Sequence, residues 1–464
     1  MKLKSIHLQN FRLFKDFRCE FDERLTVLVA NNGGGKTSIL EAICIAFGPY
    51  LSAFPTGVGS GIEIGDVHML IKDRNIGQIQ RDFPAQILAN GKLNQLTIGQ
   101  KQVLADNEIQ WFRSIASEKS GTTIKDAKVI AERGKELLKA DSIEATTQKN
   151  IWPLLAFYGT GRLWRQTKLT SKKLHADAWE QRSAGYTDCL SAASSFKFVL
   201  EWLDYATRSN VAAFSRHLSN NPHLPVRFAD FDGPFTPLLN CVQGAVNTVL
   251  KHTGWKNLYY AEALQDAILE HDDFGSIPVS QLSDGIRTTF GLVAEIAYRA
   301  VQLNPHLGEN AALETDGIVM IDEVDMHLHP HWQQTILPDL LRAFPKVQFI
   351  VTTHSPQVLS TVKRENIRLI SLEQGSIPLG MSYGEPSGNV LQSVMLVDPQ
   401  PPVAERDSLR KLTELVDQGH YQDAQTSALL EELSISLGAN HPQLQRLQRS
   451  IRRQELLKQV EPQK

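Results

Sequence analysis

A glycine-rich stretch near the N-terminus, ANNGGGKT at residues 30–37, contains the residue types of a phosphate-binding loop. Backbone amides in such a loop surround phosphate oxygens, and the following helix directs its positive end at the same anion. Lys36 would supply charge for the β- and γ-phosphates, and the Thr37 hydroxyl would bind Mg²⁺. The stretch predicts a nucleotide site; the alternative is an ordinary glycine-rich turn with a chance lysine.

The loop departs from G-x-x-x-x-G-K-[ST] at its first position, where Ala30 replaces glycine. That glycine serves the tight exit from a strand, and alanine can take its place if its φ stays negative. The three glycines that come closest to phosphate are all present. We therefore expect a working loop despite the substitution.

Two carboxylates end an apolar stretch much later in the chain, GIVMIDE at residues 317–323. A buried strand of this kind suits Asp322 for the Mg²⁺ shell and Glu323 for polarising an attacking water. Further on, VQFIVTTHSPQVL places His354 just beyond another apolar strand, where an imidazole can touch a γ-phosphate. The alternative for His354 is a capping or core histidine.

Ser283, in QLSDGIRTTFGLVAEIAYRAV, directly precedes an amphipathic helix. A serine at this position caps the helix, and its free hydroxyl lies close in sequence to a glycine. The pattern predicts a second helix N-terminus suited to an anion.

These residues need regular elements that bring them together. Residues 25–29 alternate and are partly β-branched, as a strand should be, and residues 37–47 repeat apolar positions as a buried helix should. Strand, loop and helix in this order form the context that a phosphate-binding loop requires. Apolar strands at 317–321 and 347–351 would carry the carboxylates and the histidine.

The composition is typical of a globular protein with a large core: 464 residues, 42% hydrophobic and 21% charged. A formal net charge of −3 excludes a global basic field for nucleic acid. The four cysteines have no CxxC spacing and are expected to be reduced and mostly buried. Because no apolar run approaches about 18 residues and no signal peptide is visible, we expect a cytoplasmic protein without membrane contact.

Four motifs follow one another along the chain: the phosphate loop, LSDG at residues 282–285 (the signature), MIDE, and the histidine of TTHS. This order resembles the ATP-binding-cassette ATPases. The variants are similar to the SMC/RecF-like branch, in which the opening strand runs into N-F-R, here Asn10, Phe11 and Arg12. The resemblance covers roughly residues 1–48 and 280–365. It implies an α/β fold: an ABC/RecF-like ATPase head with a mixed sheet and flanking helices, interrupted by a compact, mostly helical insert and followed by a helical C-terminal tail.

In that family two ATP molecules lie between two heads, and the signature of one head completes the site of the other. The resemblance therefore implies ATP and Mg²⁺ as cofactors and a homo-oligomer of at least a head-to-head dimer. It implies catalytic roles for Glu323 and His354, and Mg²⁺ binding by Thr37 and Asp322. Interface positions would be Asp325 and Asp284, which replaces the more usual glycine. The residues implied to bind nucleotide are Arg12, Asn32, Gly33, Gly34, Gly35, Lys36, Thr37, Ser38, Ser283 and Gly285. Of these, Ser283 and Gly285 would act in trans, on the nucleotide held by the other head.

A long segment separates the phosphate loop from the signature. An SMC protein would fill it with a coiled coil, but no a/d heptads are sustained over three or four repeats. PAQILANGKLNQLTI predicts a hairpin that turns at Asn90-Gly91, and helices are expected around 107–141 and 191–218. We expect an N-terminal ATPase lobe at 1–100, a mostly helical insertion lobe at 101–255, a C-terminal ATPase lobe at 256–375 and a helical tail at 376–464.

Within the insert, WPLLAFYGTGRLW predicts a strand at 154–157 that ends in a glycine turn with a cation. Tyr158 or Arg162 would approach nucleotide or DNA, or else the turn is structural and Arg162 forms an ion pair. Together with MIDEVDMHLHPHWQ and TTHSPQVL, this block resembles the defence-associated ATPases of the PtuA type, found in Septu systems and some retrons. That resemblance implies an HNH-type nuclease as partner, a higher oligomer and a role in antiphage defence, with possible contact to DNA or RNA through the complex.

Three further patterns have competing interpretations. The histidines of HLHPH could face one side of an extended segment and bind metal, but no nearby cysteine or carboxylate completes a tetrahedral set. The tail lacks the Asp-x-Asp of a Toprim nuclease, so we expect no intrinsic nuclease. Tail helices are predicted near 404–417 and 421–437, followed by a basic helix with a stripe at Leu444, Leu447, Ile451 and Gln454. That helix would cap the domain, dock a partner or bind phosphates.

The leading functional hypothesis is an ATP-binding and ATP-hydrolysing sensor or regulatory subunit whose nucleotide state controls an HNH-type nuclease. A RecF-like DNA-repair ATPase that binds DNA directly is the main alternative. An assembly scaffold that scarcely hydrolyses ATP is disfavoured by the intact carboxylate pair. The ATPase subunit of a transporter is disfavoured by the long segment before the signature.

Overall fold

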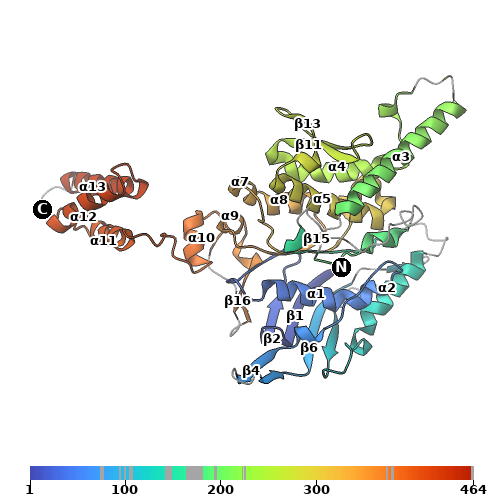
Figure 1. Ribbon diagram of the computed structural model, residues 1–464, viewed down its shortest axis with the longest axis horizontal. Helices are drawn as coiled ribbons and strands as arrows, with labels where there is room; N and C mark the ends of the chain where they lie inside the picture. Colours follow the sequence, from blue (N-terminus) through green and yellow to red (C-terminus); the bar gives the residue numbers. More distant parts are fainter. Residues whose placement is uncertain are drawn as a thin grey trace. The chain divides into compact units, whose positions relative to one another are not determined.

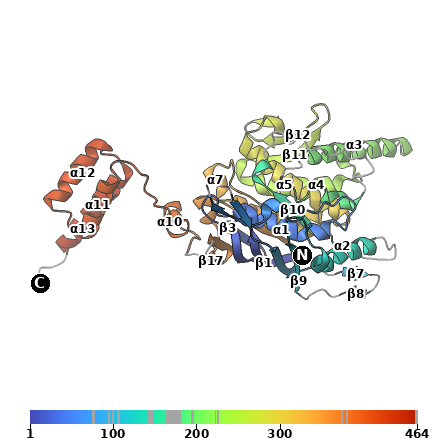
Figure 2. The ribbon, with the colours of Figure 1, turned by 60° about the horizontal axis from the view of Figure 1, so that its bottom comes forward.

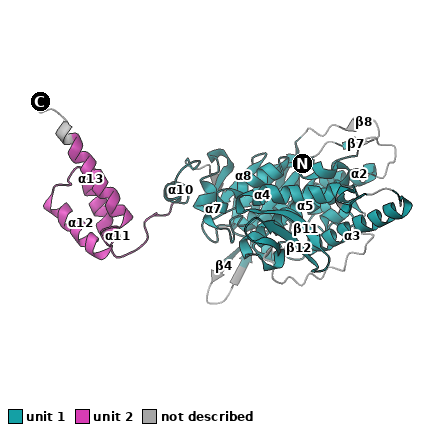
Figure 3. Ribbon diagram, turned by 90° about the horizontal axis from the view of Figure 1, so that it is seen from above, with its two compact units in different colours: residues 1–395 teal, residues 396–464 magenta. Residues whose placement is uncertain are grey.

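The computed structural model describes residues 1–73, 78–93, 96–98, 101–103, 108–141, 149–162, 181–192, 196–221, 223, 226–371, 375–377 and 381–460. The chain forms two compact units, residues 1–395 and 396–464 (Figure 3). Each unit has its own hydrophobic core. The break therefore falls twenty or so residues beyond the expected start of the tail at 376, because α10 (Ser387–Ser393) packs on α9 (Pro356–Leu359) of the first unit.

The central element is a mixed sheet whose described strands follow the order β10-β14-β15-β3-β16-β17. All neighbouring pairs are parallel except β16 and β17. The four strands from β10 to β3 are buried at every residue, as expected for parallel strands covered on both faces. The strands are β3 (Leu25–Val29), β10 (Leu154–Tyr158), β14 (Gly317–Ile321), β15 (Val347–Thr352), β16 (Ile367–Ser371) and β17 (Gly375–Ile377).

An antiparallel sheet lies beside this core, with the strand order β2-β1-β6-β9 among the described residues. Helix α1 (Lys36–Leu51) contacts both sheets and so lies between them (Figure 1). Trp111 of β9 donates from Nε1 to the carbonyl oxygen of Ala46 over 3.0 Å, which ties the sheet to the helix. The strands are β1 (Lys2–Phe11), β2 (Phe14–Glu20), β6 (Ala85–Lys92) and β9 (Ile109–Ile115).

The predicted hairpin at Asn90-Gly91 is wrong. Both residues lie inside β6, where they pair with β1 on one side and with β9 on the other. A type I′ turn needs positive φ at both central residues, and neither residue has it. Pairing with strands distant in sequence therefore outweighed the local turn preference.

Helices α4 (Thr236–Leu250) and α5 (Asp284–Leu303) lie on the side of the core sheet opposite α1 (Figure 1). A three-stranded sheet, β11-β12-β13, lies beside α4 and α3 (Phe196–Asn220) (Figure 2). Its strands are β11 (Trp255–Ala261), β12 (Asp266–His271) and β13 (Gly275–Pro278).

The range 101–255, expected to be a mostly helical insertion lobe, contains strands that belong to the two sheets described above. β9 pairs with β6, and β10 pairs in parallel with β14. A strand therefore occupies residues 109–115 where helix was predicted, and α2 (Lys128–Asp141) begins after it. The helix predicted around 191–218 corresponds to α3.

Smaller elements complete the first unit: α6 (Ala311–Glu314), α7 (Pro330–Gln333), α8 (Ile336–Ala343), β4 (Met69–Asp73), β5 (Gln78–Arg81), β7 (Leu96–Ile98) and β8 (Lys101–Val103). The α/β class is confirmed: helices flank a mixed sheet. All four cysteines are free and buried, as predicted. In the described ranges, no helix combines the length and apolar character that crossing a bilayer requires.

The second unit is a three-helix unit, as predicted for the tail: α11 (Arg406–Asp417), α12 (Ala424–Ser436) and α13 (Pro442–Val460). Leu444 and Leu447 of α13 are buried in its core, with Ile451 packed against it. Gln454 donates to the carbonyl oxygen of Val416 over 3.0 Å. The predicted stripe is therefore the face on which α13 packs against the other two helices.

Candidate functional site

The glycine-rich loop leaves β3 and enters α1, as the strand-loop-helix context requires. Gly33 and Gly35 have φ values of 77° and 87°, which favour glycine. Ala30 is buried and has no positive φ, so it fits the strand exit as expected. Its methyl group has a consequence, because a Cβ on Gly34 would lie 2.7 Å from the Cβ of Ala30. Glycine at 34 is therefore required by alanine at 30.

Phe14 of β2 packs against the loop at Gly35. A Cβ on Gly35 would collide with the Phe14 ring, which is itself buried. A Cβ on Gly33, by contrast, would meet nothing within 4 Å. One side of the loop is thus packed against the protein, and space lies over Gly33 where phosphate oxygens could approach.

Lys36 is buried at the start of α1. Its Nζ donates to the carbonyl oxygens of Ala30 and Asn31 over 2.9 and 3.4 Å, so the ammonium group folds back over the loop. Burial lowers the pKa of Lys36, while Asp322 and the two other carboxylates that follow β14 oppose that shift. Those carboxylates therefore lie close enough to act electrostatically on the loop.

Asp322 joins three segments of the chain. Thr37 donates from Oγ1 to Asp322 Oδ2 over 2.7 Å, and Thr352 donates to Asp322 Oδ1 over 2.6 Å. The backbone N–H of Asp322 donates to the carbonyl oxygen of Tyr158 over 2.8 Å. The carboxylate is almost completely buried. Its position follows from the parallel sheet, because β10, β14, β15 and β3 bring their carboxyl ends to one edge.

Glu323 follows directly and has an unusual backbone conformation. Its φ of 49° lies in the left-handed region, a conformation that non-glycine residues rarely adopt and that clusters at functional sites. The backbone N–H of Glu323 donates to Thr352 Oγ1 over 2.7 Å, so one threonine hydroxyl orients both carboxylate residues. His354 is half-buried just beyond β15, on the same edge.

Asp325 is connected to the segment of the histidine. Thr353 donates from Oγ1 to Asp325 Oδ1 over 2.5 Å. Gln333 of α7 accepts from Ser355 Oγ over 2.7 Å and donates to the carbonyl oxygen of Leu328 over 3.0 Å. The residues after Glu323 and those around His354 are therefore held together by side-chain hydrogen bonds.

The signature segment lies at the N-terminus of α5. Ser283 is exposed at the N-cap position, and its side chain makes no capping hydrogen bond. Asp284 is exposed and pairs with Arg287. Gly285 is buried, and a Cβ there would lie 2.5 Å from the carbonyl oxygen of His327. The signature therefore contacts, within one chain, the segment that follows the carboxylates.

Three further residues were expected to bind nucleotide: Arg12, Asn32 and Ser38. Arg12, with a φ of 50°, donates from Nε to Asp66 Oδ1 over 2.8 Å and also pairs with Glu41 of α1. It is thus held by two carboxylates beside the helix of the loop. Asn32 is exposed on the loop, and Ser38 is half-buried in the first turn of α1.

The strand predicted at 154–157 is confirmed as β10, but the Tyr158 side chain is fully buried, and burial raises its pKa. Tyr158 is a core residue that contributes its carbonyl to the site. The side chain of Arg162 lies outside the described residues.

The three histidines of HLHPH are exposed, and the imidazole Nδ1 of His329 accepts from the backbone N–H of His331 over 3.3 Å. Within the described part of the chain, no group of three or more His, Cys, Asp or Glu side chains could hold a metal ion.

The sequence-based prediction missed Thr352 and Thr353, which orient the carboxylates. A detectable signal was present, because both threonines directly follow the strand predicted at 347–351 and precede His354. It also missed Glu41 and Asp66 as partners of Arg12. No sequence signal indicates Asp66, which follows a segment without periodicity.

These residues fit a Mg²⁺–nucleotide. The loop offers glycine backbone and a buried lysine, and the hydroxyl of Thr37 with the carboxylate of Asp322 supplies the oxygen ligands that Mg²⁺ prefers. Mg²⁺, when bound, neutralises charge on the transferring phosphoryl group. The chain's own groups could contact phosphate, and they orient the carboxylates and place a carboxylate and an imidazole on the same edge.

Comparisons with known proteins agree with this geometry. A family model described as an AAA domain matches residues 5–208, and one described as an AAA domain, putative AbiEii toxin, Type IV TA system, matches residues 197–360. The chain is 30% identical over 449 residues to the retron Ec83 probable ATPase of Escherichia coli, covering 87% of this chain and 77% of that protein.

Two other similarities cover different shares of the chain. The chain is 34% identical over 152 residues to the Septu protein PtuA of Bacillus mycoides, covering 30% of this chain and 20% of PtuA. Among solved structures, the SMC head domain from Thermotoga maritima matches with 14% identity and a TM-score of 0.43, covering 82% of this chain and 100% of that domain.

Proposed function

The chain belongs to the SMC/RecF-like defence ATPases that include the retron Ec83 probable ATPase, and from that premise we propose that its ATP sites are composite, each built from two copies of the chain. ATP hydrolysis and the association with defence follow from the family. The assembly of the site, the roles of single residues and the controlled partner are our proposal.

The main support for a composite site is the side chain of Ser283. Its hydroxyl is exposed and uncapped at the start of α5, a helix of 20 residues. The positive end of such a helix attracts anions, and Ser283 and Asp284 are exposed to solvent at its start. The loop on the same chain already supplies phosphate contacts of its own. The signature of each copy would therefore act on the ATP held by the loop of the other.

In this arrangement Lys36 and the loop amides hold the phosphates, and Thr37 and Asp322 hold Mg²⁺. Glu323 accepts the proton of the attacking water, and His354 stabilises charge on the γ-phosphate. Asp325 accepts a hydrogen bond from Thr353, the neighbour of His354. Asp325 would therefore transmit a displacement of His354 to the subunit interface. Arg12 would act through Glu41 and α1.

We further propose that the nucleotide state of the paired heads controls an HNH-type nuclease subunit, with DNA or RNA contacted through that complex. The similarity to retron and Septu proteins supports this assignment. The tail unit supports it too, because α13 exposes Arg446, Arg449, Arg452 and Arg453 on the side away from its buried stripe.

Mixing two inactive variants tests the composite site. Lys36→Ala disables the loop, and Ser283→Arg blocks the signature. In a mixed dimer one site combines both defects, whereas the other combines the intact loop of one copy with the intact signature of the other. We expect ATPase activity to reappear on mixing, measured as phosphate release. If each site is complete within one chain, the mixture stays as inactive as its components.

A further inference from the structure

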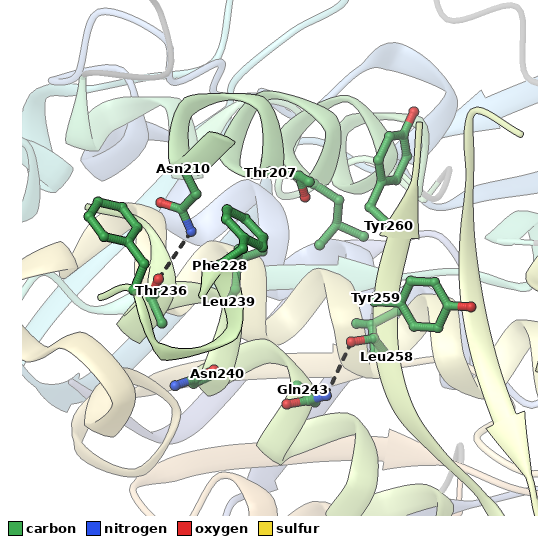
Figure 4. Close-up of a pocket in the computed structure, with 12 residues that line it drawn as sticks. Thr207, Asn210, Phe228, Thr236, Leu239, Asn240, Gln243, Leu258, Tyr259 and Tyr260 are labelled. Atoms are coloured by element: carbon green, nitrogen blue, oxygen red, sulfur yellow. Dashed lines mark hydrogen bonds between the residues drawn. The ribbon is translucent and has the colours of Figure 1, made fainter. Parts of the chain in front are cut away.

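A cavity of about 400 Å³ lies in the lobe of the signature helix, outside the residues assigned to ATP (Figure 4). Its walls come from α3, from α4, from β11 and from the turn at 228–230. The volume falls in the range of small-ligand sites, which are mostly apolar with a few placed polar groups. The cavity therefore has the size of a binding site for a small organic group.

Two phenylalanine rings form one wall. Phe228 and Phe231 line this side, and β11 lines another with Tyr259 and Tyr260, whose rings extend away from Phe228 (Figure 4). Phe214 of α3 holds the two phenylalanines in place, since its ring centroid lies 5.3 Å from each of theirs. Phe228 is 48% exposed, so a flat ring of the lining is accessible from solvent. An accessible ring of this kind favours a planar guest that can stack on it.

Two carboxamides on neighbouring turns of α4 have fixed orientations. Gln243 donates from Nε2 to the carbonyl oxygen of Leu258 over 3.2 Å, and Asn240 donates from Nδ2 to the carboxylate of Glu309 over 2.6 Å. Because both acceptors are oxygens that cannot donate, the two amide groups cannot be flipped. Gln243 Oε1 and Asn240 Oδ1 have no hydrogen-bond partner among the described residues. The cavity thus offers two hydrogen-bond acceptors to a guest.

Charge is absent from the lining. None of the described residues that line the cavity is Lys, Arg, His, Asp or Glu. A phosphate or a carboxylate inside the cavity would be buried without a counter-ion, which is costly. The guest is therefore uncharged within the cavity.

We propose that this cavity binds an unpaired nucleobase that carries an exocyclic amine. Such a base is planar and uncharged, it stacks on Phe228, and its amine donates to Gln243 Oε1 or Asn240 Oδ1. Uracil and thymine present on that edge a single N3–H between two carbonyl oxygens, and these oxygens would face the acceptors with like partial charge. The base comes either from a free nucleoside or from a single strand, whose backbone would remain in solvent.

The test uses the full-length protein with a non-hydrolysable ATP analogue bound, so that the ATP site is filled. Free cytidine and uridine are compared by saturation-transfer NMR. Fluorescein-labelled single strands of oligodeoxycytidylate and oligodeoxythymidylate are compared by fluorescence polarisation. The variant is Phe228→Ala, and the control is Tyr383→Ala, a 64% exposed tyrosine of the same unit.

We expect cytosine-containing probes to bind more tightly than those with uracil or thymine. Phe228→Ala should weaken that binding by about tenfold or more, the typical effect of removing a stacking partner, while the control stays unchanged. Binding of the strand but not of cytidine assigns the base to a nucleic acid, and binding of both shows that the nucleoside suffices.

Three results would overturn the proposal. One is the absence of saturable binding by any cytosine probe. Another is binding that Phe228→Ala leaves intact. The third is binding of N-acetyltryptophanamide in the cavity without binding of cytidine, which would make it a site for a protein side chain. Unchanged ATPase activity of Phe228→Ala confirms that the variant is folded.

Discussion

The backbone carbonyl oxygen of His327 lies directly against Gly285, so that an added Cβ would be only 2.5 Å from it. The contact joins the first turn of the signature helix to the segment that follows Glu323. Since Asp325 is bonded to Thr353, this segment also connects to the region of His354. Signature, carboxylates and histidine are therefore mechanically linked in one chain.

Gly285→Ala should break this contact. The added methyl group must displace α5 or the His327 segment, which we expect to cost about 1–3 kcal/mol of unfolding free energy and most of the ATPase activity. Gly244→Ala is the matched control on α4, because a Cβ there meets nothing within 4 Å. The unfolding free energy of Gly244→Ala should rise by about 0.5–1 kcal/mol. Equal behaviour of the two in urea unfolding and phosphate release would contradict the linkage.

Thr37→Val should impair activation by Mg²⁺. The substitution keeps the shape of the side chain but removes the hydroxyl that donates to Asp322 over 2.7 Å. We expect the Mg²⁺ concentration for half-maximal ATPase activity to rise roughly 10- to 100-fold, with Thr37→Ser close to the parent. A Mg²⁺ titration at fixed ATP measures it. An unchanged titration curve for Thr37→Val would remove this residue from the metal site.

Glu323→Gln should keep ATP binding and lower turnover by about 10²–10⁴-fold, because the amide cannot accept the proton of the attacking water. The variant should also accumulate as a closed dimer with ATP, detected by light scattering after size exclusion. Glu431→Gln, at an exposed position of α12, serves as the control. Normal turnover in Glu323→Gln would show that another group is the base.

Arg299→Ala should destabilise the first unit strongly. Arg299 and Glu295 form an ion pair in α5 at 2.8 Å, each only 2% exposed, and Arg299 also donates to the carbonyl oxygens of Gly185 and Thr187. Removing one partner leaves a buried charge, which costs about 3–5 kcal/mol. The exposed pair Lys197–Glu201 of α3 offers the control, since Lys197→Ala should change stability by under about 1 kcal/mol. Comparable urea midpoints for both variants would refute the expectation.

Replacing the exposed arginines of α13 by glutamine should weaken association with the nuclease subunit while sparing ATPase activity. The stripe that packs α13 is untouched, so the tail remains folded, unlike after deletion of 441–464, which would remove Leu444 and Leu447 from its core. Glutamine at Arg410 and Lys411 of α11 is the control. Co-purification with the product of the neighbouring gene measures the effect. A complex that forms normally would exclude this surface as the docking site.

Local patterns sufficed for the elements whose residues carry their own signal. The strand at 25–29, the loop, the start of α1, the strands of Asp322 and His354, and the tail helices were predicted from periodicity and caps. In each case propensity, burial pattern and turn chemistry agree, so tertiary contacts had nothing to override.

The secondary-structure prediction failed where pairing with distant segments determines the local structure. Asn90-Gly91 has the composition of a hairpin turn but lies within β6, because β1 and β9 pair with it on both sides. Residues 109–115 form a strand for the same reason. Such pairing joins residues far apart in sequence, and a single local window contains no trace of it.

The sequence by itself determined which residues could perform the chemistry: the loop with Lys36 and Thr37, the pair Asp322 and Glu323, His354, and Ser283 at a helix start. Only the tertiary structure decided how they are held. The parallel sheet brings Thr352 onto Asp322, the fold places Glu41 and Asp66 around Arg12, and His327 lies against Gly285. The physical reason is that residue types limit which bonds are possible, whereas the packing of distant elements selects the bonds that form.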